Sequence, residues 1–407
     1  MVELADILAQ HGPAYRAKYG DRMPRSHRRA LRDIEHCRTP TLGGHVYRCP
    51  ACAQKQYLYH SCRNRHCPKC QQDKGQRWLA AQRERLLPVS YFMLTFTLPA
   101  DLRPIARSHQ RLIYHLLFSA SAQAAQRLAR DKQRIGGQVG MLGVLHTWGR
   151  SLVYHPHVHY LVPGGGLGED GHWRPTRANF LLPAKALSKL MRGKFRDALR
   201  RANPAVFAQV PAQVWRQDWV VHCQPVGKGV NAVRYLAPYI FRVAISNRRI
   251  VRLTNGKVTF RYRATDTGAL KTCSLPAEEF IRRFLQHVLP RGFVKVRYYG
   301  FLSPGQRRRL SALKMQLGTR HSDQEHGREQ DEDDAACSEE KLDCSSRCIE
   351  VRCPSCGHVM KKVCYWTLAI WSRPKLVHLD LDFRRRGCTT NSAEIAHRHW
   401  HKDLLAN

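Results

Sequence analysis

The sequence predicts an α+β protein, with a small cysteine-rich domain ahead of a larger body of strands and helices. Segments 90–99, 140–148 and 155–163 have the aromatic and β-branched content of buried strands. The last two are joined by a short connection that contains glycine, so we expect them to pair. Segments 103–135 and 184–203 are rich in Leu, Ala and Arg and have a helical pattern.

The chain of 407 residues is long enough for two or three domains. The stretch "DQEHGREQDEDDAACSEEKLD" is acidic and poor in apolar residues, which predicts disorder. A solvated linker is favoured over an autoinhibitory mimic of nucleic acid. We therefore expect an amino-terminal basic helix with the cysteine-rich domain over 1–87, the main body over 88–310, an acidic linker over 311–347 and a basic carboxy-terminal segment over 348–407.

Charge points to a polyanionic partner. The chain has 68 Lys and Arg against 31 Asp and Glu, a formal net charge of +37. Nucleic acid is the commonest cellular polyanion, although a solvated basic surface is the alternative. No apolar run is long enough to cross a bilayer, and the first residues lack the layout of a signal peptide. We expect a soluble, cytoplasmic protein with no membrane partner.

The cysteines predict zinc. Fifteen cysteines without a secretory signal are more typical of metal ligands than of disulfides. "CPAC" (Cys49, Cys52) and "CPKC" (Cys67, Cys70) are separated by fourteen residues. Each pair can place two thiolates on one turn, and two turns complete a tetrahedral Zn²⁺ site. We expect these four cysteines to share one ion.

Further ligand-type residues allow more sites. Enough of them surround the two pairs for a second zinc site, although the histidines are equally suited to strands or a turn: Cys37, His45, His60, Cys62 and His66. A third pair, "CPSC", lies beyond the acidic stretch, and its neighbours show no clean zinc spacing: Cys353 and Cys356, with Cys344, Cys348, His358 and Cys364. A small carboxy-terminal zinc knuckle is one reading of this pair.

Three cations surround the second cysteine pair. Arg63, Arg65 and Lys69 lie within "SCRNRHCPKCQ". They suit a module that contacts phosphates of nucleic acid. The alternative is that zinc only stabilises the fold of a small domain and that these three cations are exposed to solvent without binding nucleic acid.

A histidine-rich strand is the candidate for a second kind of metal site. Side chains two apart on a strand share a face, so His157 and His159 can both donate to one ion while Val158 points into the core. The alternative is a polar strand edge. For a third ligand, His155 and His146 are both candidates, and the sequence leaves the choice open.

Two tyrosines are candidate nucleophiles. Tyr235 and Tyr239 in "AVRYLAPYIFRV" are four apart, so on a helix their hydroxyls share a face. Arg234 and Arg242 flank them and would bind DNA. Taken alone, the pair would be read as two core aromatics.

Together these stretches resemble a known family. They include "LGGHVYRCPAC", "SCRNRHCPKCQ", "LHTWG", "HPHVHYLVPGGG", "YLAPYIFRVAISN" and "LPAEEFIRRFLQHVLPRGF". They look like the two-tyrosine, rolling-circle HUH transposases of bacterial insertion sequences, of the insertion-sequence ninety-one type. The resemblance runs in order from about residue 37 to about residue 303.

The resemblance implies a fold and a set of site residues. The fold is an HUH endonuclease core, an antiparallel sheet flanked by helices with the histidine strand central, preceded by a small zinc-ribbon-like domain. His157 and His159 match the ligands of a catalytic Mg²⁺ or Mn²⁺ ion, and Tyr235 and Tyr239 match the paired nucleophiles. The partners would be single-stranded transposon ends and target DNA, in the bacterial nucleoid.

The implied activity is nicking and rejoining of single-stranded DNA through 5′-phosphotyrosine intermediates. One alternative in the same chemistry is a rolling-circle replication initiator. Another is a non-catalytic zinc-module protein that binds DNA or RNA.

Overall fold

The computed structural model describes residues 2–71, 85–228, 243–264, 267–322, 350–367 and 375–378. The chain forms two compact units, and each takes residues from separate parts of the sequence. The first unit comprises Met1–Arg38 and Ser61–Asp343, and the second comprises Thr39–His60 and Cys344–Asn407. Strand pairing is antiparallel throughout the described residues, which confirms the expected α+β class.

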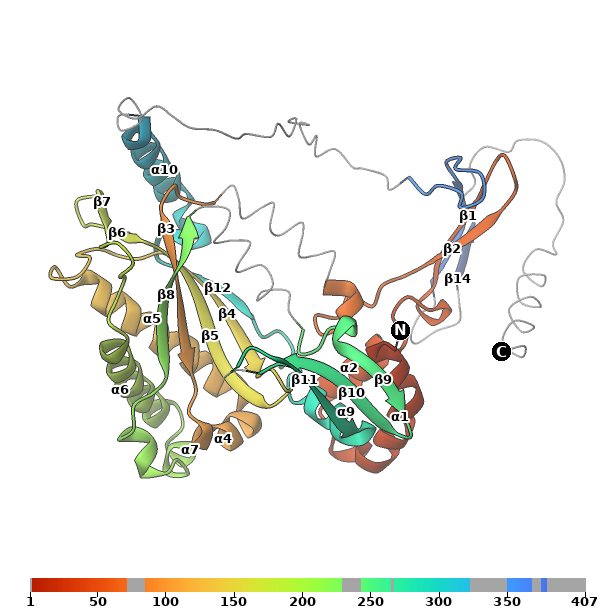
Figure 1. Ribbon diagram of the computed structural model, residues 1–407, viewed down its shortest axis with the longest axis horizontal. Helices are drawn as coiled ribbons and strands as arrows, with labels where there is room; N and C mark the ends of the chain where they lie inside the picture. The colour runs from red at the N-terminus through yellow and green to blue at the C-terminus, as the bar shows by residue number, and fades with distance from the viewer. Residues whose placement is uncertain are drawn as a thin grey trace. The chain divides into compact units, whose positions relative to one another are not determined.

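A five-stranded sheet dominates the first unit (Figure 1). Its order is β12-β4-β5-β3-β8, so the histidine-bearing strand β5 is central, as expected. The bounds of its strands are β3 (Ser90–Thr97), β4 (Met141–Trp148), β5 (Tyr154–Pro163), β8 (Val221–Lys228) and β12 (Val296–Tyr299). A two-stranded ribbon, β6 (Gly165–Leu167) and β7 (Trp173–Pro175), follows β5.

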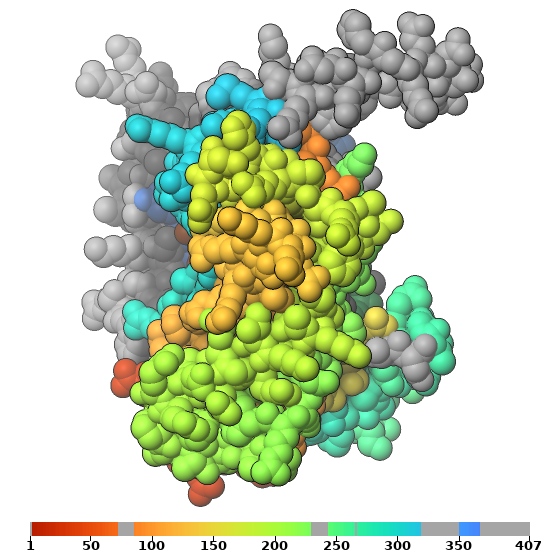
Figure 2. Space-filling model, turned by 90° about the vertical axis from the view of Figure 1, so that its left-hand side faces the viewer, coloured from red at the N-terminus to blue at the C-terminus, as the bar shows by residue number. Residues whose placement is uncertain are grey.

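Helices cover one face of this sheet. The covering helices are α4 (Arg103–Ser108), α5 (Gln110–Arg130), α6 (Ala184–Ala202) and α7 (Pro204–Ala208). Val158, Tyr160 and Val162 of β5 alternate toward these helices and are buried in the main core. Figure 2 shows this covered side, with α5 in gold and α6 in green. The intervening residues of β5, including the histidines, therefore lie on the opposite face.

A second core lies in the same unit. It is built from α1 (Leu4–Tyr19), α2 (Arg25–Glu35), α9 (Ala277–Leu285) and a three-stranded sheet of order β11-β10-β9. These strands span Ile250–Thr254 (β9), Lys257–Arg263 (β10) and Leu270–Pro276 (β11). Trp148 of β4 and the cysteines Cys37, Cys67 and Cys70 are also buried in this core.

Helix α10 (Arg307–Ser322) corrects one expected boundary. The acidic linker was expected to begin at residue 311, but the chain remains helical through this point. Leu310, Leu313 and Leu317 recur at helical spacing and pack against Phe301 in a small apolar core. This apolar face explains why the helix continues past the expected boundary.

The second unit is a four-stranded sheet made from both ends of the chain. Its order is β14-β13-β1-β2, with β1 (Gly44–Arg48), β2 (Lys55–Tyr59), β13 (Lys361–Thr367) and β14 (Lys375–His378). Strand β1 pairs with β2 on one side and with β13 on the other. The expected amino-terminal domain over 1–87 and carboxy-terminal segment over 348–407 are therefore not separate bodies, because each gives strands to this sheet.

The helix expected to carry Tyr235 and Tyr239 lies outside the described residues. Among the described helices, none combines the length and the apolar character that a membrane crossing requires.

Candidate metal centres and active site

Three histidines meet on the open face of the central sheet. In the β4–β5 pairing, His146 lies directly opposite His157, and His159 lies two residues farther along the same strand. Residues that oppose each other in an antiparallel pair point to the same face. Accordingly, one ring nitrogen from each of the three lies within 4.8 Å of the other two. This arrangement can hold one metal ion with three imidazoles.

Hydrogen bonds orient two of these rings. The Nδ1 atom of His157 lies 2.7 Å from the carbonyl oxygen of His155. Because a carbonyl only accepts, Nδ1–H donates and Nε2 carries the lone pair that a metal needs. The Thr95 hydroxyl lies 2.9 Å from Nδ1 of His159, and this hydrogen bond orients the His159 ring.

Of the two candidates for a third ligand, the structure brings His146 and not His155 into the group with His157 and His159. His155 is engaged elsewhere, because Nη2 of Arg103 lies 2.7 Å from its Nδ1. Burial and the Arg103 charge lower the pKa of His155, so it stays neutral as the acceptor of this bond. His146 is only 2 % exposed and joins His157 and His159.

Packing fixes the His146 ring. It stacks on Trp148 with ring centroids 4.8 Å apart. The amine of Lys295 lies 5.2 Å from the centre of the Trp148 ring, a cation–π contact. Burial lowers the pKa of Lys295 to about 7. The register of the β4–β5 pairing shifts just beyond this point, between His146 and Trp148.

The expected nucleophiles Tyr235 and Tyr239, with Arg234 and Arg242, lie outside the described residues. Their roles stay predictions.

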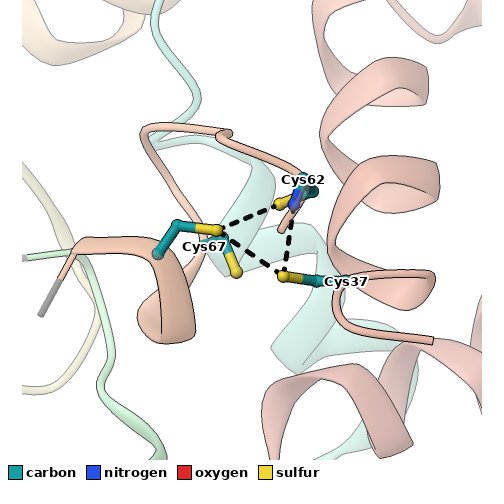
Figure 3. Close-up of side chains that lie close together, drawn as sticks. Cys37, Cys62 and Cys67 are labelled. Carbon is teal, nitrogen blue, oxygen red and sulfur yellow. Dashed lines mark hydrogen bonds between the residues drawn. The ribbon is translucent and has the colours of Figure 1, made fainter. Parts of the chain in front are cut away.

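One group of four cysteines lies in the first unit: Cys37, Cys62, Cys67 and Cys70. Figure 3 shows three of them turned toward one another from separate segments. The Cys70 sulfur lies 3.5 Å from that of Cys37 and 3.6 Å from that of Cys62. A tetrahedral site with Zn–S bonds of about 2.3 Å requires sulfur separations of about 3.8 Å. The residues therefore fit zinc.

A second group of four cysteines lies in the second unit: Cys49, Cys52, Cys353 and Cys356. Sulfur separations are 3.4 Å between Cys49 and Cys356, 3.4 Å between Cys52 and Cys353, and 3.5 Å between Cys52 and Cys356. A backbone N–H of Cys52 lowers the pKa of Cys49, which favours the thiolate that a metal binds. This group also fits zinc.

The expected four-cysteine site was therefore wrong in its grouping. Cys49 and Cys52 do not meet Cys67 and Cys70, because the two pairs belong to different compact units. Cys37 and Cys62, expected to belong to a second site, complete the first group instead. No histidine joins either group among the described residues.

The histidines near the cysteines have other contacts. The Nε2 atoms of His45 and His60 lie 3.3 Å apart, and the buried His66 ring accepts a hydrogen bond from the Leu289 amide at 3.3 Å. These contacts explain why none of the three completes a cysteine site.

Two of the three cations around the "CPKC" knuckle are engaged within the protein. Arg65 donates to the Phe293 carbonyl at 2.6 Å, and Lys69 forms an ion pair with Glu3 at 2.5 Å. Arg63 is exposed. The role of these three cations in contacting phosphates stays a prediction.

Two regions of the chain match known protein families. Residues 7–98 match a family described as "Transposase zinc-binding domain", and residues 140–310 match one described as "Putative transposase". "Putative transposase y4qJ" of Sinorhizobium fredii is 40% identical over 74% of this chain and 80% of its own length. The "Transposase for insertion sequence element IS801" of Pseudomonas savastanoi is 33% identical over 67% of this chain and 71% of its own.

The chain belongs to the insertion-sequence transposases of the IS91 and IS801 type. It is a transposase with an amino-terminal zinc-binding domain, and DNA is its partner. No solved structure matches the chain significantly.

The histidine group lies within the region matched by the second family, and the first cysteine group lies within the region matched by the zinc-binding domain. Cys353 and Cys356 lie beyond both regions. The sequence does hold a signal for their true partners: "CPAC" and "CPSC" are each followed by a strand, whereas "CPKC" leads into helical residues 68–71.

Proposed function

We propose that this transposase cuts and rejoins single-stranded DNA by a rolling-circle route, with a divalent ion at the three histidines and a tyrosine nucleophile. The observation that carries the proposal is the convergence of His146, His157 and His159 on the open face of the central sheet. In a chain of this family, such a site is suited to a scissile phosphate.

The histidines would hold Mg²⁺ or Mn²⁺, leaving the remaining coordination positions to phosphate and water oxygens. When bound, the ion supplies a positive charge that polarises the phosphate and stabilises the leaving oxygen. Imidazoles alone do not select this ion over Zn²⁺. His157 supports the site through its Nδ1–H bond to the His155 carbonyl, which keeps Nε2 available.

Tyr235 and Tyr239 would be the nucleophiles. Attack of a tyrosine Oη on phosphorus forms the O–P bond and breaks the bond from phosphorus to O3′. The tyrosine gives up its proton and the leaving oxygen gains one, so a 5′-phosphotyrosine and a free 3′-OH result. The reverse reaction with another 3′-OH rejoins the strand without ATP. A second tyrosine allows a second cleavage while the first adduct persists.

The substrates would be transposon ends and target DNA in single-stranded form, met in the cytoplasm at the nucleoid. The net charge of +37 supports binding to the phosphate backbone.

The test is adduct formation with labelled single-stranded DNA that carries the element's own end, in Mn²⁺, followed by denaturing electrophoresis. We expect a labelled band at protein size for the wild-type chain and none for the Tyr235→Phe, Tyr239→Phe double variant. Tyr262→Phe, on β10, is the matched control and should form the adduct normally. An adduct in the double variant would disprove the nucleophile assignment.

A further inference from the structure

The two knuckles of the second cysteine group share one backbone geometry. The Cys49 amide donates to the Gln54 carbonyl at 2.9 Å, and the Ala53 amide donates to the Cys49 carbonyl at 3.1 Å. Cys353 repeats both bonds, at 2.8 Å with His358 and 2.9 Å with Gly357. The fourth residue after the first cysteine is left-handed in both cases, with φ 57° at Ala53 and 74° at Gly357. Two such turns face each other.

Sheet pairing holds these turns together. Each knuckle leads into a strand, β2 in one case and β13 in the other, and both strands pair with β1 between them. Cys49 and Cys353 are buried with Val351 and Met360 in a small core, and the exposed Cys52 and Cys356 complete the cysteine group. Such a core is too small to hold two chain segments together alone, and a metal ion at the four cysteines would crosslink them.

We infer that Cys49, Cys52, Cys353 and Cys356 bind a second Zn²⁺ ion, which joins the two ends of the chain into one module. The site takes two of its ligands from beyond both family-matched regions. Removal of the carboxy-terminal segment would then remove two of the four ligands, and also β13 and β14, from the four-stranded sheet.

The test is the zinc content of the purified full chain. We expect two Zn²⁺ per chain, one per cysteine group, and one after Cys353→Ser with Cys356→Ser. Cys364→Ser is the control, because Cys364 lies on β13 outside both groups and should leave two. Retention of two Zn²⁺ by the double variant would overturn the inference.

A measurement on the wild-type chain guards against misfolding of the variants. Titration of the metal-free chain with Co²⁺ should develop thiolate-to-cobalt absorption up to two equivalents. Saturation at one equivalent would also overturn the inference.

A separate observation concerns one face of this sheet. Tyr57 and Tyr59 of β2 are 51% and 37% exposed, and their rings lie 6.5 Å apart, nearly parallel. The Trp366 ring of β13 meets Tyr57 at 6.4 Å and Tyr59 at 6.0 Å, edge to face. Trp366 reaches them across β1 because Gly44 stands between, where an added Cβ would lie 3.1 Å from the Trp366 ring.

Cationic side chains lie next to these aromatic rings on the four-stranded sheet. Arg48 of β1 lies opposite Lys55 of β2, and the two-residue alternation puts both on the face of Tyr57. Lys361 of β13 pairs with Arg48 after a register shift in the β1–β13 pairing. All three are exposed, and none forms an ion pair within the described residues. An aromatic platform next to a row of cations matches the flat faces and the phosphates of an unpaired strand.

We propose that this face, the residues Tyr57, Tyr59, Trp366, Arg48, Lys55 and Lys361, binds single-stranded DNA by base stacking. The proposal rests on the proposed action on single strands and locates a contact outside the cleavage site. A duplex hides its base faces, so this surface would prefer unpaired DNA.

The test is the affinity for a fluorescent oligothymidylate, measured by anisotropy in the full chain. We expect Tyr57→Ala and Tyr59→Ala each to weaken binding about tenfold and to leave duplex binding unchanged. Phenylalanine at either position should restore the affinity. Leu58→Ala is the matched control, because Leu58 is 37% exposed on the opposite face of the same strand.

Wild-type affinity in the alanine variants, or an equal loss with duplex DNA, would overturn the stacking proposal. The measurement needs no cleavage and can be made in the Tyr235→Phe, Tyr239→Phe background. Failure of the adduct assay with intact stacking would therefore count against the proposed function alone.

Discussion

At the residue scale, the hydrogen bonds of single side chains determine what the site can bind. His157 can offer Nε2 only because its Nδ1–H is held by the His155 carbonyl. His155 itself is removed from the set by Arg103. Neither fact can be read from the alternating histidines in the sequence, which offered His155 and His146 equally. The grouping depends on the strand pairing that puts His146 opposite His157 and on an arginine from another element.

Ala53 holds a left-handed conformation that costs an L-residue energy. We expect Ala53→Gly to increase the free energy of unfolding of the second unit by about 0.5 to 1 kcal/mol. The equivalent Gly357→Ala should destabilise it by at least as much, although its Cβ would meet open space. Competition with a chromophoric chelator in urea would measure both. Equal zinc retention in the two variants would contradict the matched geometry of the knuckles.

His287 should make stability depend on pH. Its ring is buried between the Thr147 hydroxyl and the Leu152 carbonyl, and burial lowers its pKa to about 4. An unfolded histidine titrates near pH 6.5. Between these values the unfolded chain binds a proton that the folded chain does not, so stability falls as pH falls, by on the order of 3 kcal/mol in all.

Urea denaturation at pH 7 and pH 4.5 would measure this loss. His287→Gln cannot titrate, so its stability should fall less over the same interval. An identical fall in the variant and the wild-type chain would show that His287 is not the titrating group.

At the element scale, the sequence was a good guide to strands and a poor one to their partners. The strands at 90–99, 140–148 and 155–163 were predicted because apolar and aromatic content follows local burial. The cysteine grouping failed because Cys49 and Cys353 lie about 300 residues apart in sequence and are brought together only by strand pairing. Cysteine spacing in the sequence suggested that neighbouring pairs share an ion, whereas the sheet brings together pairs that are far apart in the sequence.

A substitution at Gly143 of β4 would test how tightly this strand packs against the Tyr160 ring of β5. An added Cβ would lie 2.5 Å from the Tyr160 ring, which is fully buried and hydrogen-bonded to Ser121 at 2.8 Å. We expect Gly143→Ala to destabilise the chain by about 1 to 3 kcal/mol.

Gly193→Ala on α6 is the control. Its Cβ would meet nothing within 4 Å, so it should stabilise the chain by about 0.5 to 1 kcal/mol. Thermal unfolding would compare the two, and equal melting temperatures would mean that Tyr160 can move.

At the scale of the whole molecule, we expect the net charge of +37 and the cations Arg48, Lys55 and Lys361 to contribute to DNA binding. Single-strand affinity should fall steeply with salt, by about 0.7 in log–log slope for each phosphate neutralised. Arg48→Gln, Lys55→Gln and Lys361→Gln together should reduce that slope by about 2. Anisotropy over a salt series would measure it, and an unchanged slope would mean that these cations do not touch phosphates.

The central claim is that His146, His157 and His159, without His155, form the metal site that serves cleavage. The most direct measurement is covalent adduct formation in Mn²⁺ by four single alanine variants. The account predicts loss of the labelled band for His146→Ala, His157→Ala and His159→Ala, with DNA binding kept, and a retained band for His155→Ala. A full-strength adduct in His146→Ala, or in both His157→Ala and His159→Ala, would contradict it.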